Sequence, residues 1–356
     1  MTNLQHRVVM VAGGAGFVGS AIVRELLARG ISVVCYDNYL HGVPKNVEGL
    51  TGPLTIVRAD ALNTWQLAKT IKDNDVDYII NCIGDTFVPT CYEIPQRFFD
   101  VNLQCTYNLL MASKLCGVKR MMYVSSTEVY GQLDDVYRFS ESVPYQPLNT
   151  YAVSKLAADR LCFTFNVEHK IPVIIARIFN AYGPRETHPY IIPEIITQLA
   201  KGPVLKLGNV RAERDLTYVH DTARALIAVL ESDIPNGEAV NVGSDTSYSV
   251  EWLAHTLADL MNIKNLEIRE DPRRFRRLDL DRLRCDNTKL RQWTSWEPQV
   301  DIHDGLQRTI DWFKENGERW SWEGRQNDVT FASDDHAYAD ANSVEAETGM
   351  LSAAGT

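Results

Sequence analysis

Residues 8–19 read VVMVAGGAGFVG, an apolar run that passes directly into the glycine spacing G-x-x-G-x-x-G. A helical pattern follows at once, so the glycines occupy a turn between a strand and a helix. In such a turn Gly13 permits the tight bend, Gly16 lets the backbone approach a pyrophosphate, and Gly19 lets the helix pack against the strand. Free amides at the helix start face the anion, which favours a dinucleotide-binding loop over a plain turn. The residues expected to bind this cofactor are Gly13, Gly16, Phe17, Val18 and Gly19.

Short apolar runs alternate with longer amphipathic segments over residues 7–180. The runs expected as strands are Arg7–Val11, Ser32–Tyr36, Leu54–Val57, Tyr78–Cys82, Arg120–Ser125 and Val173–Ile178. The segments expected as helices are Phe17–Arg29, Asn63–Lys72, Asp100–Cys116 and Tyr151–His169. Nearly continuous hydrophobic strands separated by helices predict a parallel sheet covered on both faces. The predicted fold class is α/β, a doubly wound Rossmann sheet with a smaller, mostly helical C-terminal lobe.

Three parts are expected along the chain: a dinucleotide-binding Rossmann domain at 1–180, a second, smaller lobe at 181–327 and an acidic tail at 328–356. After residue 180 the helical patterns are joined by longer loops and short β pieces. Those expected in this lobe are helices Ile192–Ala200, Asp221–Glu231, Val250–Met261 and Ile302–Asn316, and a strand Ala239–Val242. The tail holds six acids and no Lys or Arg. It lacks an apolar period, so we expect it to be disordered.

The composition is that of an ordinary globular chain of 356 residues, with 45% hydrophobic and 23% charged residues. A net charge of −10 argues against a nucleic-acid partner. No apolar stretch approaches the roughly 20 residues that a membrane helix needs. Seven cysteines without a C-x-x-C pair argue against a disulfide framework or a zinc site, and no other spacing indicates a metal. We therefore expect a soluble cytoplasmic protein without a metal site.

A carboxylate at the end of the second expected strand bears on the choice of dinucleotide. Asp37 stands eighteen residues after Gly19, where it would accept hydrogen bonds from ribose hydroxyls and repel a 2′-phosphate. NAD is therefore favoured over NADP, although the same aspartate could serve as a turn residue. Asn38 beside it is counted with the cofactor-binding residues. After the third strand, Asp60 and Ala61 are placed to hold the adenine amino group.

Tyr151 and Lys155 form a Tyr-x-x-x-Lys pair on an expected helix. Because they are four residues apart, they project from one face of that helix. A lysine ammonium beside a phenol stabilises the phenolate and lowers its pKa. Such a tyrosine takes a proton from a sugar or alcohol hydroxyl while hydride leaves the same carbon. On many helices such a pair is only part of the solvent-exposed face. In a chain that also has a glycine loop and this architecture, the pair indicates a catalytic role.

Further motifs accompany these residues along the chain. They include Tyr36–Asn38, Asp100–Asn102, Val124–Gly131, Arg177–Arg185 and Arg214–Val219. With the glycine loop and the tyrosine–lysine pair, they resemble the extended short-chain dehydrogenase/reductases that act on nucleotide sugars. The resemblance covers about residues 7–316. It implies NAD as cofactor, a nucleoside-diphosphate sugar as substrate, cofactor contacts for Asn102, Tyr151 and Lys155, and Ser126 as the hydroxyl partner of the tyrosine.

In this resemblance the first step is shared: the tyrosine deprotonates the sugar 4-hydroxyl and hydride passes from C4 to NAD⁺. The two positions after Ser126 decide the outcome. A 4-ketone acidifies the C5 proton, which Glu128 would remove as water leaves C6. Similar 4,6-dehydratases carry an acidic or hydroxyl residue before the glutamate, and Thr127 fits the hydroxyl version. Thr127 in place of aspartate removes the strongest candidate acid for expelling the 6-hydroxyl, so water or Thr127 itself would relay that proton.

Other reactions on the same 4-keto sugar stay open. Simple 4-epimerases need no base, and in UDP-glucuronate decarboxylases a similar glutamate only anchors a sugar hydroxyl or the loop. We predict an NAD-dependent nucleotide-sugar 4,6-dehydratase of carbohydrate biosynthesis, with a 4-epimerase or a UDP-glucuronate decarboxylase as alternatives, hence a lyase or an isomerase. A net dehydrogenase or reductase and a non-catalytic NAD sensor are the other classes. A sensor has no reason to keep Ser126, Tyr151 and Lys155 together.

Arginines in the second lobe are candidates for the substrate diphosphate, because guanidinium groups match phosphate oxygens bidentately. Arg214 is the first candidate, followed by Arg274 or Arg277 in the run at 273–277. That run could equally be a solvated loop paired with nearby acids. The resemblance aligns Asn180 with an asparagine that contacts the substrate diphosphate.

The same resemblance implies a homodimer, in which the helices Asp100–Cys116 and Tyr151–His169 of two subunits form a four-helix bundle. Apolar residues such as Leu109, Leu110 and Phe163 could serve that interface or the core of the subunit. No nucleic acid and no membrane is expected as a partner.

Overall fold

A seven-stranded parallel sheet forms the centre of the computed structural model, which describes residues 3–133, 136–275 and 281–316. The order of its strands is β11-β7-β5-β4-β1-β2-β3. They are β1 (Val8–Ala12), β2 (Ser32–Asp37), β3 (Leu54–Arg58), β4 (Tyr78–Asn81), β5 (Arg120–Ser126), β7 (Val173–Ile178) and β11 (Ala239–Val242). The predicted doubly wound α/β class is confirmed, and the tail expected at 328–356 lies outside the described residues.

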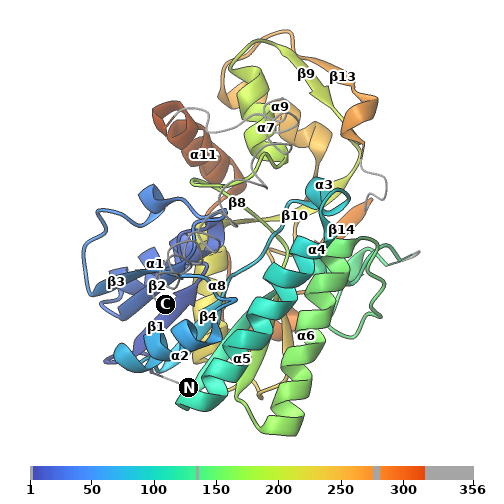
Figure 1. The fold of residues 1–356 in the computed structure, drawn as a ribbon. Helices are drawn as coiled ribbons and strands as arrows, with labels where there is room; N and C mark the ends of the chain where they lie inside the picture. Colours follow the sequence, from blue (N-terminus) through green and yellow to red (C-terminus); the bar gives the residue numbers. More distant parts are fainter. Residues whose placement is uncertain (1–2, 134–135, 276–280, 317–356) are drawn as a thin grey trace, which may run out of the picture.

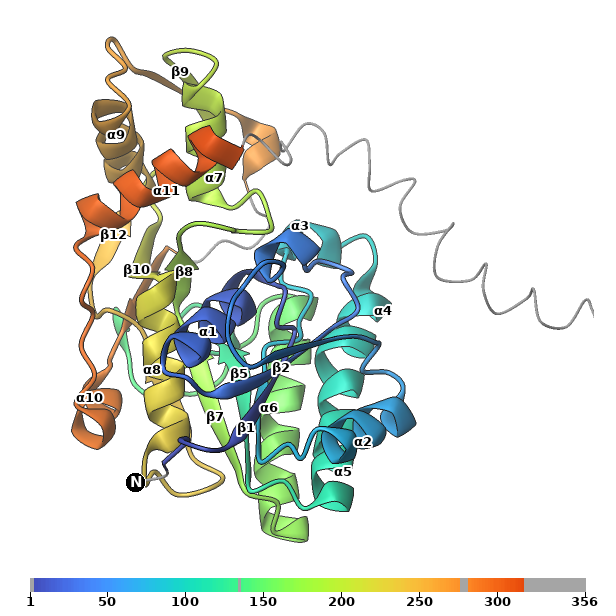
Figure 2. The same cartoon turned by 90° about the vertical axis from the view of Figure 1, so that its left-hand side faces the viewer.

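Helices cover both faces of this sheet (Figures 1 and 2). Their bounds are α1 (Phe17–Ala28), α2 (Thr64–Asp73), α5 (Cys105–Cys116), α6 (Thr150–His169) and α8 (Val219–Glu231). Successive side chains of a strand point to opposite faces. Val9 and Val11 accordingly pack in the core on the α1–α8 side with Leu226, whereas Met10 packs on the α2–α5–α6 side with Leu109. Alternate side chains of one strand therefore belong to two separate hydrophobic cores, one on each face of the sheet.

A second lobe stands above the carboxyl ends of the strands in Figure 1. Its helices are α7 (Ile191–Leu199), α9 (Val250–Leu260) and α11 (Ile302–Asn316). Its strands are β8 (Asn180–Tyr182), β9 (Val204–Leu207), β10 (Glu213–Tyr218), β12 (Ser247–Ser249), β13 (Glu267–Glu270) and β14 (Arg282–Cys285). β9 pairs with β13, and β10 is the centre of a mixed sheet with β8, β12 and β14; β6 (Arg138–Phe139) completes it beside β14. Within the described ranges, no helix is both long and apolar enough to cross a lipid bilayer.

The chain returns to the first sheet after residue 180. β11 pairs in parallel with β7, and the core formed by α1 also contains residues of α8. The sequence analysis assigned both elements to the second lobe, whereas in the structure β11 is part of the first sheet and α8 packs beside α1. The physical reason is that the β7 edge would otherwise leave its ladder groups unpaired and α1 would leave apolar surface exposed. α10 (Thr288–Thr294) packs against α8 and β11 in turn.

The order of the strands reverses at β1, whose neighbours are β2 on one side and β4 on the other. Ligands of open α/β sheets bind at such a switch point, outside the carboxyl ends of the strands. The segment that follows β4 is fixed by Asn102, which is fully buried in a π-helical stretch, η2 (Phe99–Gln104). Its amide group donates to the Ser154 hydroxyl at 2.8 Å and to the Asp85 carbonyl at 3.1 Å. The helix expected at Asp100–Cys116 is therefore helical throughout, but its first residues are π-helical where they support the crevice, and α5 begins only at Cys105.

Candidate active site

A pocket opens at the switch point, between the sheet and the second lobe. The predicted site residues that line it are Gly13, Gly16, Phe17, Val18, Gly19, Ser126, Thr127, Glu128, Tyr151, Lys155, Asn180 and Arg214. These residues come from the ends of β1 and β5, from the first turns of α1 and α6, and from β8 and β10. Segments that are two hundred residues apart in the sequence thus meet around one cavity. The predicted residues outside its lining are Asp37, Asn38, Asp60, Ala61, Asn102 and Arg274.

The glycine turn has no room for side chains. Gly13 adopts a φ of +77°, and a Cβ atom there would lie 2.9 Å from the carbonyl carbon of Cys82. At Gly19 a Cβ atom would lie 2.0 Å from the carbonyl oxygen of Gly13. The bend and the close helix packing expected of these two glycines are therefore what the structure shows. The first turn of α1 lines the pocket, and the start of a helix suits an anionic cofactor.

We expect Gly19→Ala to damage both the fold and the binding of the dinucleotide. The new methyl group would push α1 away from Gly13, and overpacking of this kind typically costs about 1–3 kcal/mol. Urea unfolding and the amount of NAD that copurifies with the protein measure the two effects. Gly30→Ala is the matched control, because a Cβ atom there meets nothing within 4 Å and adds only the roughly 1–2 kcal/mol of a left-handed alanine. Full NAD content in Gly19→Ala would contradict the cofactor role of this turn.

Two carboxylates lie where the ribose and adenine ends of a dinucleotide are expected. Asp37 accepts hydrogen bonds from the backbone amides of Ala15 and Tyr39 at 2.9 and 2.7 Å. Burial raises its pKa, while these donors oppose that rise. The hydrogen bond from the Tyr39 amide, two residues further along, is the one that an aspartate makes as a turn residue. Asp37 therefore stabilises the loop after β2 in addition to lying at the end of that strand. Asn38 donates to the Asp60 carboxylate at 3.0 Å, which joins the ends of β2 and β3.

Tyr151 and Lys155 lie on the first turns of α6, whose start is capped by the Asn149 side chain accepting from the Ala152 amide at 2.8 Å. Lys155 donates to the carbonyl of Val124 at 2.6 Å, and burial lowers the pKa of this lysine to about 8. Burial, and after it the charge of Glu128, raises the pKa of the Tyr151 phenol well above its ordinary value. This direction is opposite to the lowering expected from the sequence. Burial, which removes the phenol from water, therefore has a larger effect on the pKa of Tyr151 than the ammonium group of Lys155. That ammonium group donates its hydrogen bond to the backbone carbonyl of Val124.

Ser126, Thr127 and Glu128 follow one another where β5 ends. The Ser126 hydroxyl accepts from the Glu128 amide at 3.2 Å and also hydrogen-bonds the Tyr151 side chain. The Glu128 carboxylate accepts from the Asn149 side chain at 2.9 Å. The Thr127 hydroxyl is buried and has no hydrogen-bond partner among the residues that the structure describes. One short segment therefore offers a hydroxyl to the tyrosine, a carboxylate to the pocket and a second hydroxyl beside it.

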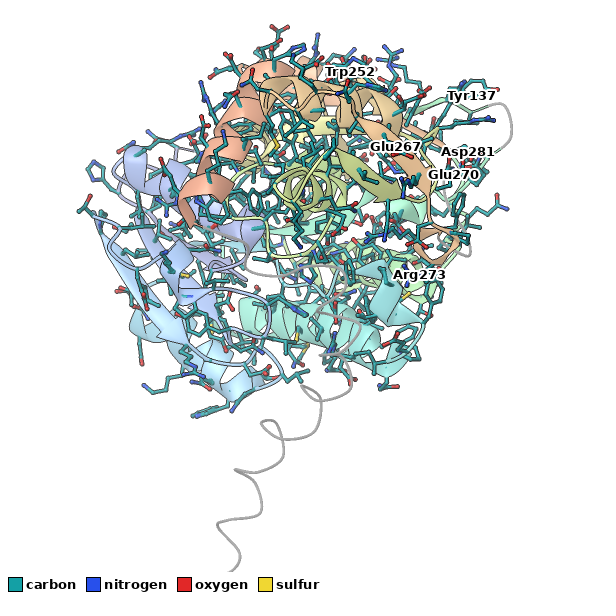
Figure 3. All side chains as sticks on the ribbon, turned by 90° about the horizontal axis from the view of Figure 1, so that it is seen from above. Tyr137, Trp252, Glu267, Glu270, Arg273 and Asp281 are labelled. Carbon is teal, nitrogen blue, oxygen red and sulfur yellow. The ribbon has the colours of Figure 1, made fainter. Side chains whose placement is uncertain are left out.

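The candidate diphosphate ligands fall into two groups. Arg214 and Asn180 line the pocket from β10 and β8. Arg274 lies instead in an ion pair with Glu194, at 2.6 Å, and its side chain is 9% exposed. Arg273 pairs with Asp271 at 2.8 Å and its side chain is 69% exposed, as expected of the solvated-loop interpretation (Figure 3). Arg277 lies outside the described residues.

Several pocket residues were missed by the sequence analysis. His41, Glu186 and His188 also line the cavity. Glu186 is 3% exposed, and burial raises its pKa well above its ordinary range. Glu186 and His188 lie two residues apart in the segment before α7, whereas His41 lies in the loop after β2. No local spacing connects that loop with this segment, so only the folded structure shows that they share one pocket. Asn149 was recognisable from the sequence, since an asparagine just before a helical pattern is a typical N-cap.

This fold and pocket define an NAD-dependent enzyme built on a Rossmann domain, and known proteins narrow that class. The model of the "NAD dependent epimerase/dehydratase family" matches residues 9–243. A UDP-N-acetyl-alpha-D-glucosaminuronate decarboxylase of Bacillus cytotoxicus is 30% identical over 319 residues, which cover 86% of this chain and 97% of the relative. A GDP-6-deoxy-D-mannose reductase of Pseudomonas aeruginosa is 34% identical over 246 residues, covering 66% of this chain and 80% of the relative.

A solved structure is similar over nearly the same length. It is a dTDP-glucose 4,6-dehydratase of Streptomyces venezuelae with NAD and TYD bound. It superimposes with a TM-score of 0.79 and 29% identity, covering 87% of this chain and 97% of that chain. The chain belongs to the NAD-dependent epimerase/dehydratase family. Its cofactor is NAD, which fits the glycine cradle around Gly13 and Gly19 and the carboxylate at the end of β2.

Proposed function

We propose that the protein is a nucleotide-sugar 4,6-dehydratase, which oxidises the sugar at C4, removes water across C5 and C6, and reduces C6. The observation that carries the proposal is the Glu128 carboxylate, which lines the same pocket as Tyr151 and Ser126. Because both groups line one pocket, they can act on neighbouring carbons of one bound sugar ring. The similar solved structure of a dTDP-glucose 4,6-dehydratase supports this choice.

Each side chain in the pocket has a distinct task in this proposal. Tyr151 takes the proton of the sugar 4-hydroxyl, and its hydrogen bond with Ser126 orients the phenol. The chemistry that NAD supplies when bound is reversible acceptance of hydride, together with a positive charge that favours the phenolate. Glu128 removes the C5 proton, which the 4-ketone has acidified. Asn149 donates a hydrogen bond to one oxygen of that carboxylate and so helps to orient it.

The departure of the 6-hydroxyl needs a proton, and Thr127 is placed to deliver it. Its hydroxyl lies next to Glu128 and has no hydrogen-bond partner in the described part of the chain. A buried hydroxyl without a partner costs free energy, so a substrate hydroxyl that binds there relieves that cost. Thr127 would donate its hydroxyl proton to the departing 6-hydroxyl, which leaves as water, and would regain a proton from Glu128, which has taken the one from C5. Both side chains then return to their starting protonation states, and no separate acid is needed.

A second candidate is decarboxylation of a nucleotide hexuronate. The observation in its favour is the 30% identity to a UDP-N-acetyl-alpha-D-glucosaminuronate decarboxylase over 86% of this chain. In that reaction the 4-ketone stabilises the carbanion left by carbon dioxide, and no base at C5 is needed. Glu128 would then hold a sugar hydroxyl. The two candidates differ in the substrate and in the mass of the product.

The decisive experiment incubates the purified protein, without added cofactor, with a panel of nucleotide hexoses and nucleotide hexuronates. Mass spectrometry and NMR identify the products. We expect the loss of one water from a hexose. Loss of carbon dioxide from a hexuronate would replace this proposal by the decarboxylase, and an unchanged mass with altered C4 stereochemistry would replace it by an epimerase. Steady consumption of NAD(H) would indicate a net oxidoreductase, and no change with any substrate would favour a sensor.

We also infer a homodimer through α5 and α6, which lie side by side in both views (Figures 1 and 2). Leu115 and Phe163 are 64% and 43% exposed on these helices. Leu109 and Leu110 are fully buried and belong to the core of the subunit instead. The interface residues therefore come from the outer face of the helix pair.

A further inference from the structure

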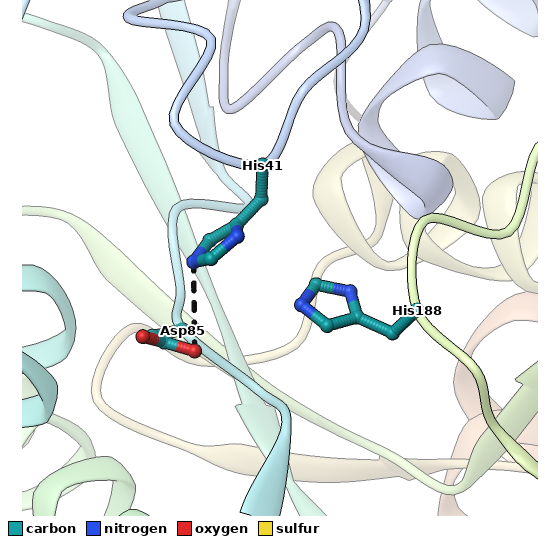
Figure 4. A group of neighbouring side chains, drawn as sticks. All are labelled: His41, Asp85 and His188. Carbon is teal, nitrogen blue, oxygen red and sulfur yellow. Dashed lines mark ion pairs between the residues drawn. The ribbon is translucent and has the colours of Figure 1, made fainter. Parts of the chain in front are cut away.

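Three side chains from separate parts of the chain meet at one edge of the pocket. His41 follows β2, Asp85 follows β4, and His188 precedes α7. Their ligand-type atoms all lie within 4.8 Å of one another. Figure 4 shows both imidazole rings and the carboxylate directed toward a common space. Two of the segments belong to the NAD-binding domain, and the third leads into the second lobe.

The protein fixes the orientation of each of these groups. Asp85 is fully buried, and one of its oxygens, Oδ2, accepts a hydrogen bond from Arg97 Nε at 2.6 Å. The other oxygen, Oδ1, faces His41 Nε2 at 3.5 Å. The Thr187 hydroxyl lies 3.1 Å from Nδ1 of His188. Hydrogen bonds of this kind to the outer atoms of imidazole and carboxylate groups are what orients the ligands in metal sites.

The inner atoms of the cluster are weakly satisfied for buried polar atoms. Oδ1 of Asp85 and Nε2 of His41 face each other at the 3.5 Å of a long ion pair, and neither makes a well-formed hydrogen bond to any other residue that the structure describes. Buried polar atoms in native proteins are almost always paired, and an unoccupied ion position is one recognised reason for exceptions.

The donor set indicates the kind of ligand. Two imidazole nitrogens and one carboxylate oxygen suit a first-row transition ion such as Zn²⁺, whereas Mg²⁺ and Ca²⁺ prefer oxygen ligands alone. Three protein ligands leave a fourth position of a tetrahedral ion open. His41 and His188 line the pocket, so the open position would face it.

We propose that His41, Asp85 and His188 form a binding site for a divalent transition-metal ion of the Zn²⁺ type. The ion joins the loops after β2 and β4 to the segment that enters α7, beside the Tyr190 hydroxyl, which lies 2.6 Å from that of Thr86 and already links the same two segments. The site was invisible in the sequence because its ligands are 44 and 103 residues apart.

The test uses the purified full chain with its NAD, stripped of metals with a chelator and then dialysed. Titration with Co²⁺ is followed by visible absorption, and Zn²⁺ affinity is measured by competition. We expect one equivalent of Co²⁺ with the spectrum of a nitrogen and oxygen site. His41→Ala and His188→Ala should each weaken binding by about 100-fold or more, since each removes a ligand. His255→Ala, an exposed histidine on α9, is the matched control and should bind like the wild type.

Folding of each variant is checked by circular dichroism and by its retained NAD. If His188→Ala or His41→Ala does not fold, the corresponding asparagine variants preserve a polar side chain and take their place. Absence of stoichiometric binding by the wild type overturns the proposal. So does equal affinity in the His41 and His188 variants, or a strong thiolate charge-transfer band, which would place the ion on the cysteines. These outcomes do not depend on turnover, so they are separate from the test of the proposed function.

Discussion

Tyr151→Phe is expected to lower turnover by roughly 10²–10⁴-fold, the usual contribution of a positioned acid–base group. Removing only the phenol oxygen leaves the ring, which is 7% exposed and packs edge-on against Phe98. The variant should therefore fold normally and retain NAD. Steady-state kinetics on the substrate identified by the product panel measures the loss, and the NAD content of the purified protein measures the integrity of the pocket.

Tyr107→Phe is the matched control, because Tyr107 lies on α5 and is 39% exposed. It should keep full activity. An active Tyr151→Phe enzyme would exclude this phenol as the proton acceptor and shift attention to Glu128. Loss of NAD together with activity would instead indicate that the substitution disturbs the fold around Phe98.

Glu128→Gln is expected to separate the two halves of the reaction. The amide oxygen can still accept the hydrogen bond of Asn149, so the segment at the end of β5 should keep its place. The amide cannot remove the C5 proton, and dehydration should fall by about 10²–10⁴-fold. Oxidation at C4 depends on Tyr151 and should continue.

The separation is measured with substrate deuterated at C4 and with solvent deuterium. Reduced NAD should accumulate in the variant at first contact with substrate, while exchange at C5 and loss of water stop. Glu168→Gln, an exposed change near the end of α6, should leave both steps intact. Unchanged dehydration in Glu128→Gln would refute the base assignment, and loss of C4 oxidation as well would mean that Glu128 mainly binds substrate.

The local features of the fold were accessible from the sequence because each depends on neighbouring residues. β7, β11 and α11 have the predicted bounds, and the other strands of the first sheet differ from theirs by one residue at one or both ends. The glycine turn was equally predictable, since Gly13 and Gly19 are set by sterics within one strand–turn–helix unit. Such apolar runs and short glycine turns are compatible with few other local structures, so their conformation can be predicted from the sequence.

Features that depend on distant contacts were not accessible. The direction of the Tyr151 pKa change depends on how deeply α6 buries the phenol and on the Val124 carbonyl that engages Lys155. Arg274 resembled a phosphate ligand, yet Glu194 on α7 pairs with it. The cluster around Asp85 assembles three loops that no local pattern connects. In each case the charge or burial of a residue is decided by a partner from another element.

The return of the chain to the first sheet at α8 and β11 affects the order in which the protein can fold during synthesis. The first sheet lacks its β11 edge, and α1 its covering helix, until residue 242 has been synthesised. By then β8, α7, β9 and β10 have already emerged, so the N-terminal domain cannot close ahead of the lobe that follows it. Domains that are contiguous in sequence fold one after another during translation. Here the two parts are interleaved, and the pocket between them forms as part of a single folding event.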